Sequence, residues 1–154
     1  MASLNAIELL REDHEKVRQL LSELSNTTNR AAKKRSELLQ KIKKEVEVHA
    51  QIEEEIFYPA FRKSSAEESE KLYHEAKEEH RAVDRLVLPD LEETEPTSEE
   101  FQGRVKVLKD MIEHHAEEEE QEMFVKAQEV FSEEELEELG QRMAERKQEL
   151  RKSL

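Results

Sequence analysis

Residues that interrupt helices are scarce in this chain, which contains two glycines and three prolines among 154 residues. Between these breaks, apolar residues recur at steps of three and four, the spacing of amphipathic helices, and strands have little support. Short connections between helices favour antiparallel neighbours. The pattern therefore predicts an all-α fold, an up-down-up-down antiparallel four-helix bundle with a short C-terminal helix.

Polar clusters and prolines set the expected helix boundaries. The second helix should kink or end near Pro59, and the third should stop at Leu88-Pro89. We expect a bundle over residues 1–131 and an amphipathic helix over 132–154 that packs on it. That last helix could instead mediate dimerisation, so a monomer and a homodimer both stay open. The expected bundle helices span about residues 3–26, 31–60, 66–88 and 99–130.

Three helix starts carry the residue types of N-terminal caps. Ser65 with Glu68 has the spacing of a capping box before the third helix. Thr97 or Ser98 is placed to cap the fourth helix. The last helix opens at Ser132, again with a glutamate three residues later.

Composition excludes several classes of protein. The chain has 39 acidic against 25 basic residues and a net charge of −14, which makes nucleic acids and anionic membranes poor partners. It has no cysteine, so disulfides and thiolate metal sites are excluded, and two glycines are too few for a phosphate-binding loop. The start has no secretory pattern and no apolar run is long enough to span a membrane, so we expect a cytoplasmic protein.

Polar residues interrupt the apolar stripe of each expected bundle helix. The first and third helices carry one histidine each on that stripe. The second and fourth each carry a histidine followed four residues later by a glutamate, and residues with this spacing share a helix face. These candidate site residues are His14, His49, Glu53, His80, His115 and Glu119.

An offset of 66 residues relates the two halves of the chain. It superposes Asp13-His14-x-x-Val17 on Glu79-His80-x-x-Val83, and His49-Ala50-x-x-Glu53-Glu54 on His115-Ala116-x-x-Glu119-Glu120. Duplication of a helical hairpin explains both matches. In antiparallel helices, residues equally far from the connecting turn lie at one level, so all six candidates can meet at one depth of the bundle.

Four imidazoles and two carboxylates in an apolar interior would be costly without partners. A pair of metal ions satisfies all six groups. Nitrogen and oxygen ligands without thiolate favour non-haem iron first, with manganese or zinc as competitors. The Glu-x-x-His motif of ferritin-like sites is absent, so a different site is expected.

At these residues the chain resembles the hemerythrin-like family, also called the HHE cation-binding domain, a four-helix bundle around a di-iron centre. The resemblance extends through about residue 127. It implies that the four histidines are terminal iron ligands and that Glu53 and Glu119 are bridging carboxylates. Oxygen-carrying members add a fifth histidine one turn from the third-helix ligand, where this chain has Ala76 and Asp84.

The resemblance leaves the reaction open. We expect binding or sensing of O2, peroxide or NO. The alternatives are an enzyme that dismutes hydrogen peroxide or reduces NO, and a bundle clipped by a structural metal. Residues that could orient a ligand or line the site are Tyr73, Glu54, Glu120 and His114.

Overall fold

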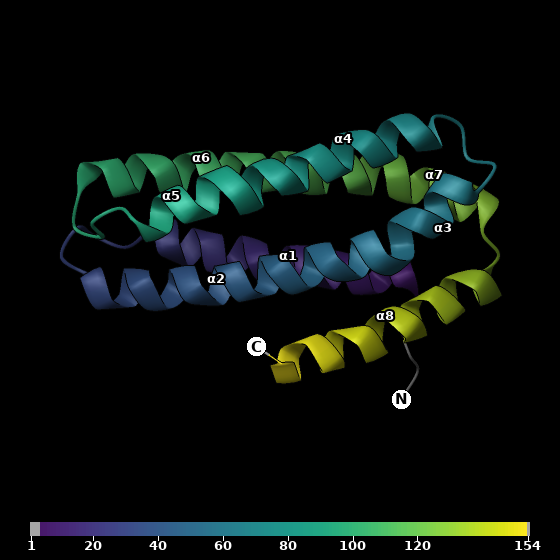
Figure 1. The fold of residues 1–154 in the computed structure, drawn as a ribbon, viewed down its shortest axis with the longest axis horizontal. Helices are drawn as coiled ribbons and strands as arrows, with labels where there is room; N and C mark the ends of the chain where they lie inside the picture. Colours follow the sequence, from purple (N-terminus) through teal and green to yellow (C-terminus); the bar gives the residue numbers. More distant parts are fainter. Residues whose placement is uncertain (1–3, 154) are drawn as a thin grey trace.

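The computed structural model describes residues 4–153, which form helices and no strand. Four antiparallel rods make a bundle, and one more helix follows them (Figure 1). The predicted all-α four-helix bundle with a C-terminal helix is confirmed. The first rod is α1 (Ala6–Ser25); the second is α2 (Ala32–Ile52), η1 (Glu53–Phe57) and α3 (Tyr58–Lys63); the third is α4 (Ser69–Ala82), η2 (Val83–Val87) and α5 (Leu88–Glu92); the fourth is α6 (Glu99–Glu118), η3 (Glu119–Met123) and α7 (Phe124–Val130); the last helix is α8 (Glu133–Ser153).

Two of the predicted caps are confirmed. The hydroxyl of Ser98 accepts a hydrogen bond from the N–H of Phe101 at 3.1 Å, which caps α6. Before α8, the N–H of Ser132 donates to the carboxylate of Glu135 at 2.9 Å, and the N–H of Glu135 donates back to the Ser132 hydroxyl at 3.1 Å. Side-chain oxygens here satisfy N–H groups that a helix start leaves without partners.

The predicted capping box at Ser65 is wrong. The helix begins at Ser69, and the preceding Glu68 adopts a left-handed φ of 61° without capping through its side chain. The turn is organised by Ser64 instead, whose hydroxyl donates to the carbonyl of Phe61 at 2.6 Å and accepts from the N–H of Ala66 at 3.2 Å. The chain therefore needs more residues than predicted to reverse direction.

The prediction that the third helix stops at Leu88-Pro89 is also wrong, because this rod continues to Glu92. Proline has no N–H to donate, and its ring clashes with the carbonyl four residues earlier in a regular α-helix. Here the π-helical segment η2 precedes Pro89, and η1 likewise precedes Pro59. Their wider turns bond residues five apart and let each rod pass its proline without ending.

Two apolar clusters fill the bundle, one towards each end. One includes Leu10, Phe57 and Phe124 and also takes in side chains of α8. The other includes Leu21, Ile42 and Leu108. The six candidate site residues fall between the stretches that build these clusters. Among residues 4–153, no helix is both long and apolar enough to cross a membrane.

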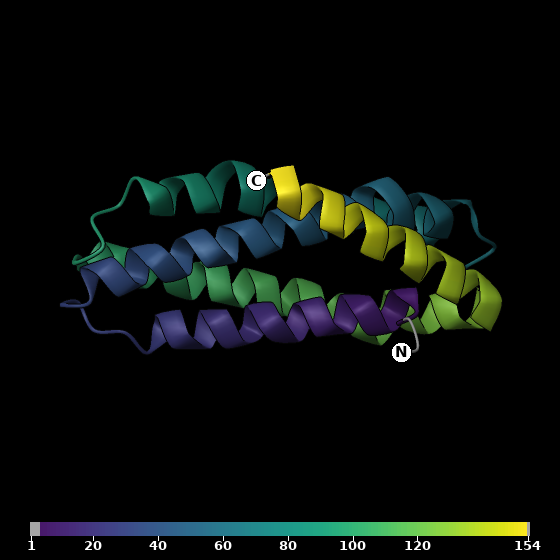
Figure 2. The ribbon, with the colours of Figure 1, turned by 90° about the horizontal axis from the view of Figure 1, so that it is seen from below.

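Helix α8 turns back along the outside of the bundle, against α1 and α2 (Figures 1 and 2). The contact is close at Gly140, where an added Cβ would lie 2.7 Å from the carbonyl carbon of Asn5 and 2.8 Å from the nitrogen of Ala6. Buried Met143 and Leu150 continue the packed face. Only glycine lets the two backbones approach this closely.

Candidate metal centre

Polar side chains from all four rods meet between the two apolar clusters. The carboxylates of Glu53 and Glu119 are 0% and 2% exposed, and the four imidazoles are between 5% and 13% exposed. Each lies on the inward stripe of its rod, as the sequence spacing predicts. The structure thus brings together all six predicted residues, namely His14, His49, Glu53, His80, His115 and Glu119.

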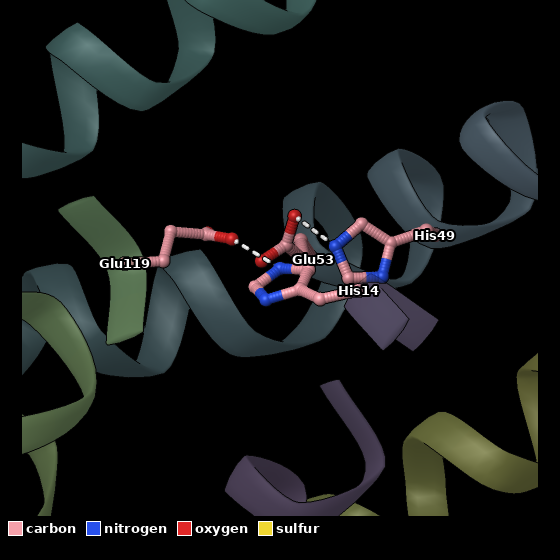
Figure 3. A group of neighbouring side chains, drawn as sticks. All are labelled: His14, His49, Glu53 and Glu119. Carbon is pink, nitrogen blue, oxygen red and sulfur yellow. Dashed lines mark hydrogen bonds and ion pairs between the residues drawn. The ribbon is translucent and has the colours of Figure 1, made fainter. Parts of the chain in front are cut away.

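Four of these residues form one group that could hold a cation (Figure 3). The Nε2 atom of His14 lies 3.0 Å from Oε1 of Glu119, and Nε2 of His49 lies 3.1 Å from Oε1 of Glu53. One nitrogen or oxygen of each residue lies within 4.8 Å of the corresponding atoms of the others. A single metal ion can therefore reach all four.

A second group combines Glu53 with His80 and His115. The Nε2 atom of His80 lies 3.2 Å from Oε1 of Glu53 and 3.1 Å from Nε2 of His115. Glu119 also approaches this group, since its Oε1 lies 3.4 Å from Nε2 of His115. The two positions share Glu53 and adjoin Glu119, the arrangement that bridging carboxylates require.

Two atoms in this cluster lack hydrogen-bond partners, although their surroundings exclude water. Among the described residues, Nε2 of His49 and Oε2 of Glu53 are buried and accept or donate no hydrogen bond. Buried polar atoms nearly always have a partner in folded proteins. An imidazole nitrogen and a carboxylate oxygen left in this way are donor atoms suited to a metal ion, so the residues present fit the group that the resemblance implies.

A second row of carboxylates orients the imidazoles from outside. Each binds the Nδ1 atom of a histidine in the other helix hairpin or in the neighbouring helix, at 2.8–3.1 Å. With Nδ1 donating to a carboxylate, Nε2 is left free for a metal ion. The pairs repeat at the offset of 66 residues: Asp13 with His49 and Glu79 with His115; Glu54 with His80 and Glu120 with His14.

Basic residues hold two of these outer carboxylates. Arg18 donates two hydrogen bonds to Glu120, both at 3.1 Å, from the same helix that carries His14. Lys147 of α8 contacts Asp13. The predicted roles of Glu54 and Glu120 near the imidazoles match their positions, whereas Asp13, Glu79 and Lys147 were not among the residues predicted to orient a ligand.

The charges of the cluster offset one another. Burial alone would lower the pKa of His80, but hydrogen bonds to Glu53 and Glu54 raise it to about 9. In the same way, Glu53 and Asp13 raise the pKa of His49 well above its usual value against the effect of burial. Despite its own burial, Glu53 has a pKa well below the usual range because His49 lies beside it. Metal ions and protons compete for these atoms, so metal binding here would release protons.

Tyr58 is the residue in the cluster that the sequence did not reveal. Its side chain is fully buried, and its hydroxyl donates to Oε2 of Glu119 at 2.6 Å and lies 3.2 Å from Oε1 of Glu53. The same oxygen lies 3.2 Å from Nε2 of His80. Burial and the two carboxylates raise its pKa well above the usual value, so the hydroxyl keeps its proton.

The π-helical segments explain why this tyrosine faces the site. The N–H of Tyr58 bonds the carbonyl of Glu53 five residues earlier, which brings the two side chains towards one face. The segment η3 does the same for Phe124 and Glu119. Tyr58 and Phe124 are 66 residues apart, so the halves differ by one hydroxyl group at equivalent positions.

Two other predicted residues lie outside the cluster. The ring of Tyr73 packs edge-on against Tyr58, with 6.1 Å between centroids, and is therefore one layer removed from the imidazoles. His114 is 65% exposed and lies near Glu79 and Glu118 on the exterior, 3.8 and 3.2 Å away. Neither is placed to bind an ion held by the inner residues.

A cavity of about 800 Å³ reaches the cluster and is lined by all four imidazoles. Much of its wall is apolar, including Val17, Val83 and Ile112. Its exposed lining residues come mainly from α2, η1, α4 and η2, so the mouth lies between the second and third rods. Small molecules therefore have a route from the surface to the candidate metal positions.

Comparison with known proteins agrees with this geometry. The family model described as the Hemerythrin HHE cation binding domain matches residues 5–127, which contain all six inner residues and end before α8. The match covers the four-helix bundle. The helix α8 lies beyond it.

Two similar proteins extend the comparison. The crystal structure of a hemerythrin HHE cation binding domain-containing protein from Mycobacterium kansasii superposes with a TM-score of 0.85 and 32% identity, over 97% of this chain and 89% of that one. A protein named DNA nickase from Nostoc is 31% identical over 122 residues, which cover 79% of this chain and 33% of the relative. The present chain thus spans about a third of the length of that relative.

Proposed function

Because the chain belongs to the hemerythrin HHE cation-binding domain family, we propose that its inner residues hold two iron ions in a carboxylate-bridged centre. The four histidines would be terminal ligands, and Glu53 and Glu119 would be the bridges. The observation that carries this proposal is the pair of unpartnered buried atoms, Nε2 of His49 and Oε2 of Glu53, within a cluster of six metal-ligating side chains.

Iron is favoured by the chemistry of the donor set. Imidazoles suit iron, zinc and copper, whereas carboxylates suit harder ions, and iron accepts both in one site. The chain has no cysteine to draw the site towards thiolate-bound zinc. Manganese and zinc are the competing ions, and metal analysis separates them.

We infer that the centre binds or senses a small oxidant: O2, peroxide or NO. Two ferrous ions supply the electrons that binding such a molecule draws on. The chain contributes the cavity that leads to the cluster and the outer carboxylates that fix the imidazoles. Since Ala76 and Asp84 stand where oxygen carriers have a further histidine, reversible oxygen transport is not the proposed role.

Spectroscopy of the reduced protein tests this binding role. Iron-loaded protein is reduced without air and then exposed in turn to O2, peroxide and NO. A new visible absorption that appears with one of these and disappears on its removal supports the proposal. His49→Ala should lack it. Fully loaded wild-type protein with an unchanged spectrum in all three cases contradicts the proposal and favours a structural metal clip.

A peroxide-dismuting enzyme is the second candidate, and Tyr58 favours it. Converting two molecules of hydrogen peroxide into two of water and one of O2 requires protons to be moved between oxygen atoms. The Tyr58 hydroxyl is buried, protonated and 2.6 Å from Glu119, so it can hold a proton at the centre. The same oxygen could also serve as a further protein ligand.

Oxygen evolution separates an enzyme from a binding protein. An oxygen electrode should record O2 release from hydrogen peroxide by the iron-loaded chain, and His49→Ala and Glu119→Ala should abolish it. The exposed His114→Ala is the matched control and should retain the wild-type rate. Binding spectra without oxygen release would leave the sensing role as the better description.

For partners, we propose a small oxidant and no nucleic acid. The net charge of −14 repels a phosphate backbone, and the similarity to the protein named DNA nickase covers only a third of that protein. The chain would act as a monomer or a homodimer.

A further inference from the structure

We propose that α8 is part of the metal centre: Lys147 is a positioning residue that holds Asp13 against His49 and so supports metal binding at one of the two positions. This inference rests on the proposed function, because it assumes that His49 binds a metal ion. It assigns a role to a helix that lies beyond the residues matched by the family model.

Three side chains form a continuous path from α8 to the cluster. The ammonium group of Lys147 contacts Oδ1 of Asp13. The other oxygen, Oδ2, accepts a hydrogen bond from Nδ1 of His49 at 2.9 Å. His49 then presents Nε2, which is buried and has no hydrogen-bond partner, to the metal position. Outer partners of this kind fix the orientation and tautomer of a ligating imidazole.

Burial makes the lysine necessary. The side chain of Asp13 is 6% exposed and that of Lys147 is 19% exposed, so water can do little to stabilise this carboxylate. A buried carboxylate needs a positive partner or several hydrogen bonds. When Nε2 of His49 binds a metal ion, the imidazole is neutral, and Lys147 is then the positive side chain that faces Asp13.

The equivalent position in the other half has no such lysine. Glu79, 66 residues after Asp13, donates no burial problem because it is 29% exposed and accessible to water. Its outer neighbour is the exposed His114, with Nε2 at 3.8 Å. The His115 side of the centre is therefore independent of α8, whereas the His49 side depends on it.

Packing fixes the position of Lys147 without help from its own ion pair. Lys147 follows Met143 by four residues and precedes Leu150 by three, so it lies on the packed face of α8. Those two side chains are 0% and 8% exposed, and the close backbone contact at Gly140 adds to the docking. Loss of the lysine charge should therefore leave α8 in place and change the centre.

Zinc titration in competition with a coloured chelator tests the inference, on the full chain after its metals have been removed. The wild type should bind two zinc ions. In Lys147→Met, one of the two affinities should fall about 10–100-fold while the other is unchanged. Lys147→Gln should act in the same direction, and Lys147→Arg should restore binding. The control is Arg151→Met, which removes a different ion pair of α8, to Glu45 at 2.9 Å.

A second readout distinguishes positioning from general stability. In iron-loaded protein, Mössbauer spectra of Lys147→Met should change in only one of the two iron signals, and thermal unfolding of the metal-free protein should match that of Arg151→Met. Two unchanged zinc affinities in Lys147→Met would overturn the inference, as would an equal loss in Arg151→Met. A wild-type chain that binds no zinc or iron would refute the proposed function itself, and this inference with it.

Discussion

Replacing Tyr58 by phenylalanine removes one oxygen atom from the centre and makes the two halves equivalent there, since residue 124 is already phenylalanine. The lost hydroxyl donates to Oε2 of Glu119 at 2.6 Å and to Oε1 of Glu53 at 3.2 Å in a fully buried place. A hydrogen bond to a charged group contributes about 1.5–3 kcal/mol. We expect the metal-free variant to lose about that much free energy of unfolding.

The corresponding change in melting temperature can be measured by circular dichroism after chelation. For a chain of this length, 1 kcal/mol corresponds to about 2–4 °C, so Tyr58→Phe should melt roughly 3–12 °C below the wild type. Tyr73→Phe is the matched control, because its ring packs on Tyr58 without reaching the carboxylates. Its change should stay within about 0.5 kcal/mol, as for substitutions away from buried networks.

The same variant tests the proton role in the iron-loaded protein. If Tyr58 holds a proton for peroxide dismutation, oxygen evolution should fall by a factor on the order of 100 or more. The reasoning is refuted by a Tyr58→Phe protein that melts with Tyr73→Phe. It is refuted for catalysis alone if the variant is destabilised as expected but releases oxygen at the wild-type rate.

Three further predictions concern the fold and its charges. Gly140→Val should destabilise the chain by about 1–3 kcal/mol, because its side chain must displace the backbone near Asn5; thermal unfolding measures this, and unchanged stability would show that the contact is loose. Metal-free protein should be most stable between about pH 4.5 and 6.5 in melting experiments across pH: the contribution of Glu120, with a pKa of about 2, is complete above 4.5 and lost as pH falls through 2, and that of His80, with a pKa of about 9, is complete below 6.5 and lost as pH rises through 9. A stability maximum above pH 9 would contradict it. Arg35→Met should cost about 1–3 kcal/mol for each carbonyl left unpaired, since the fully buried Arg35 donates to the carbonyls of Thr27 and Pro96, and zinc affinity should not change.

The bundle and its inner residues could be predicted because both depend on a simple period. Few glycines and prolines leave long helices, and a histidine or glutamate on the apolar stripe of such a helix must face the interior. The pairs at i and i+4 and the offset of 66 residues then bring six side chains to one level. Each of those steps uses distances along the chain.

Tyr58 escaped prediction because it depends on a departure from that period. In a regular α-helix, residues five apart lie on different faces, and Tyr58 would point away from Glu53. The π-helical segment η1 turns more slowly and brings them together. The proline at position 59 is the signal that could have suggested a wider turn, since a regular helix cannot accommodate it.

Lys147 could not be predicted because its role depends on where α8 docks. A lysine between Met143 and Leu150 on a packed face is unusual, but the sequence does not say which carboxylate it meets. The contact with Asp13 depends on the close approach of two backbones at Gly140. Helix ends failed for a similar reason at Ser65, where the turn geometry around Ser64 decided the start of α4.

The central claim is that six buried side chains hold two iron ions. Metal analysis of the chain, purified without added metal, tests it most directly when protein concentration is measured on the same sample. The account predicts two irons per chain, and a loss of iron in Glu53→Ala. A folded chain, with full helical circular dichroism and no transition metal even after incubation with ferrous iron, would contradict it.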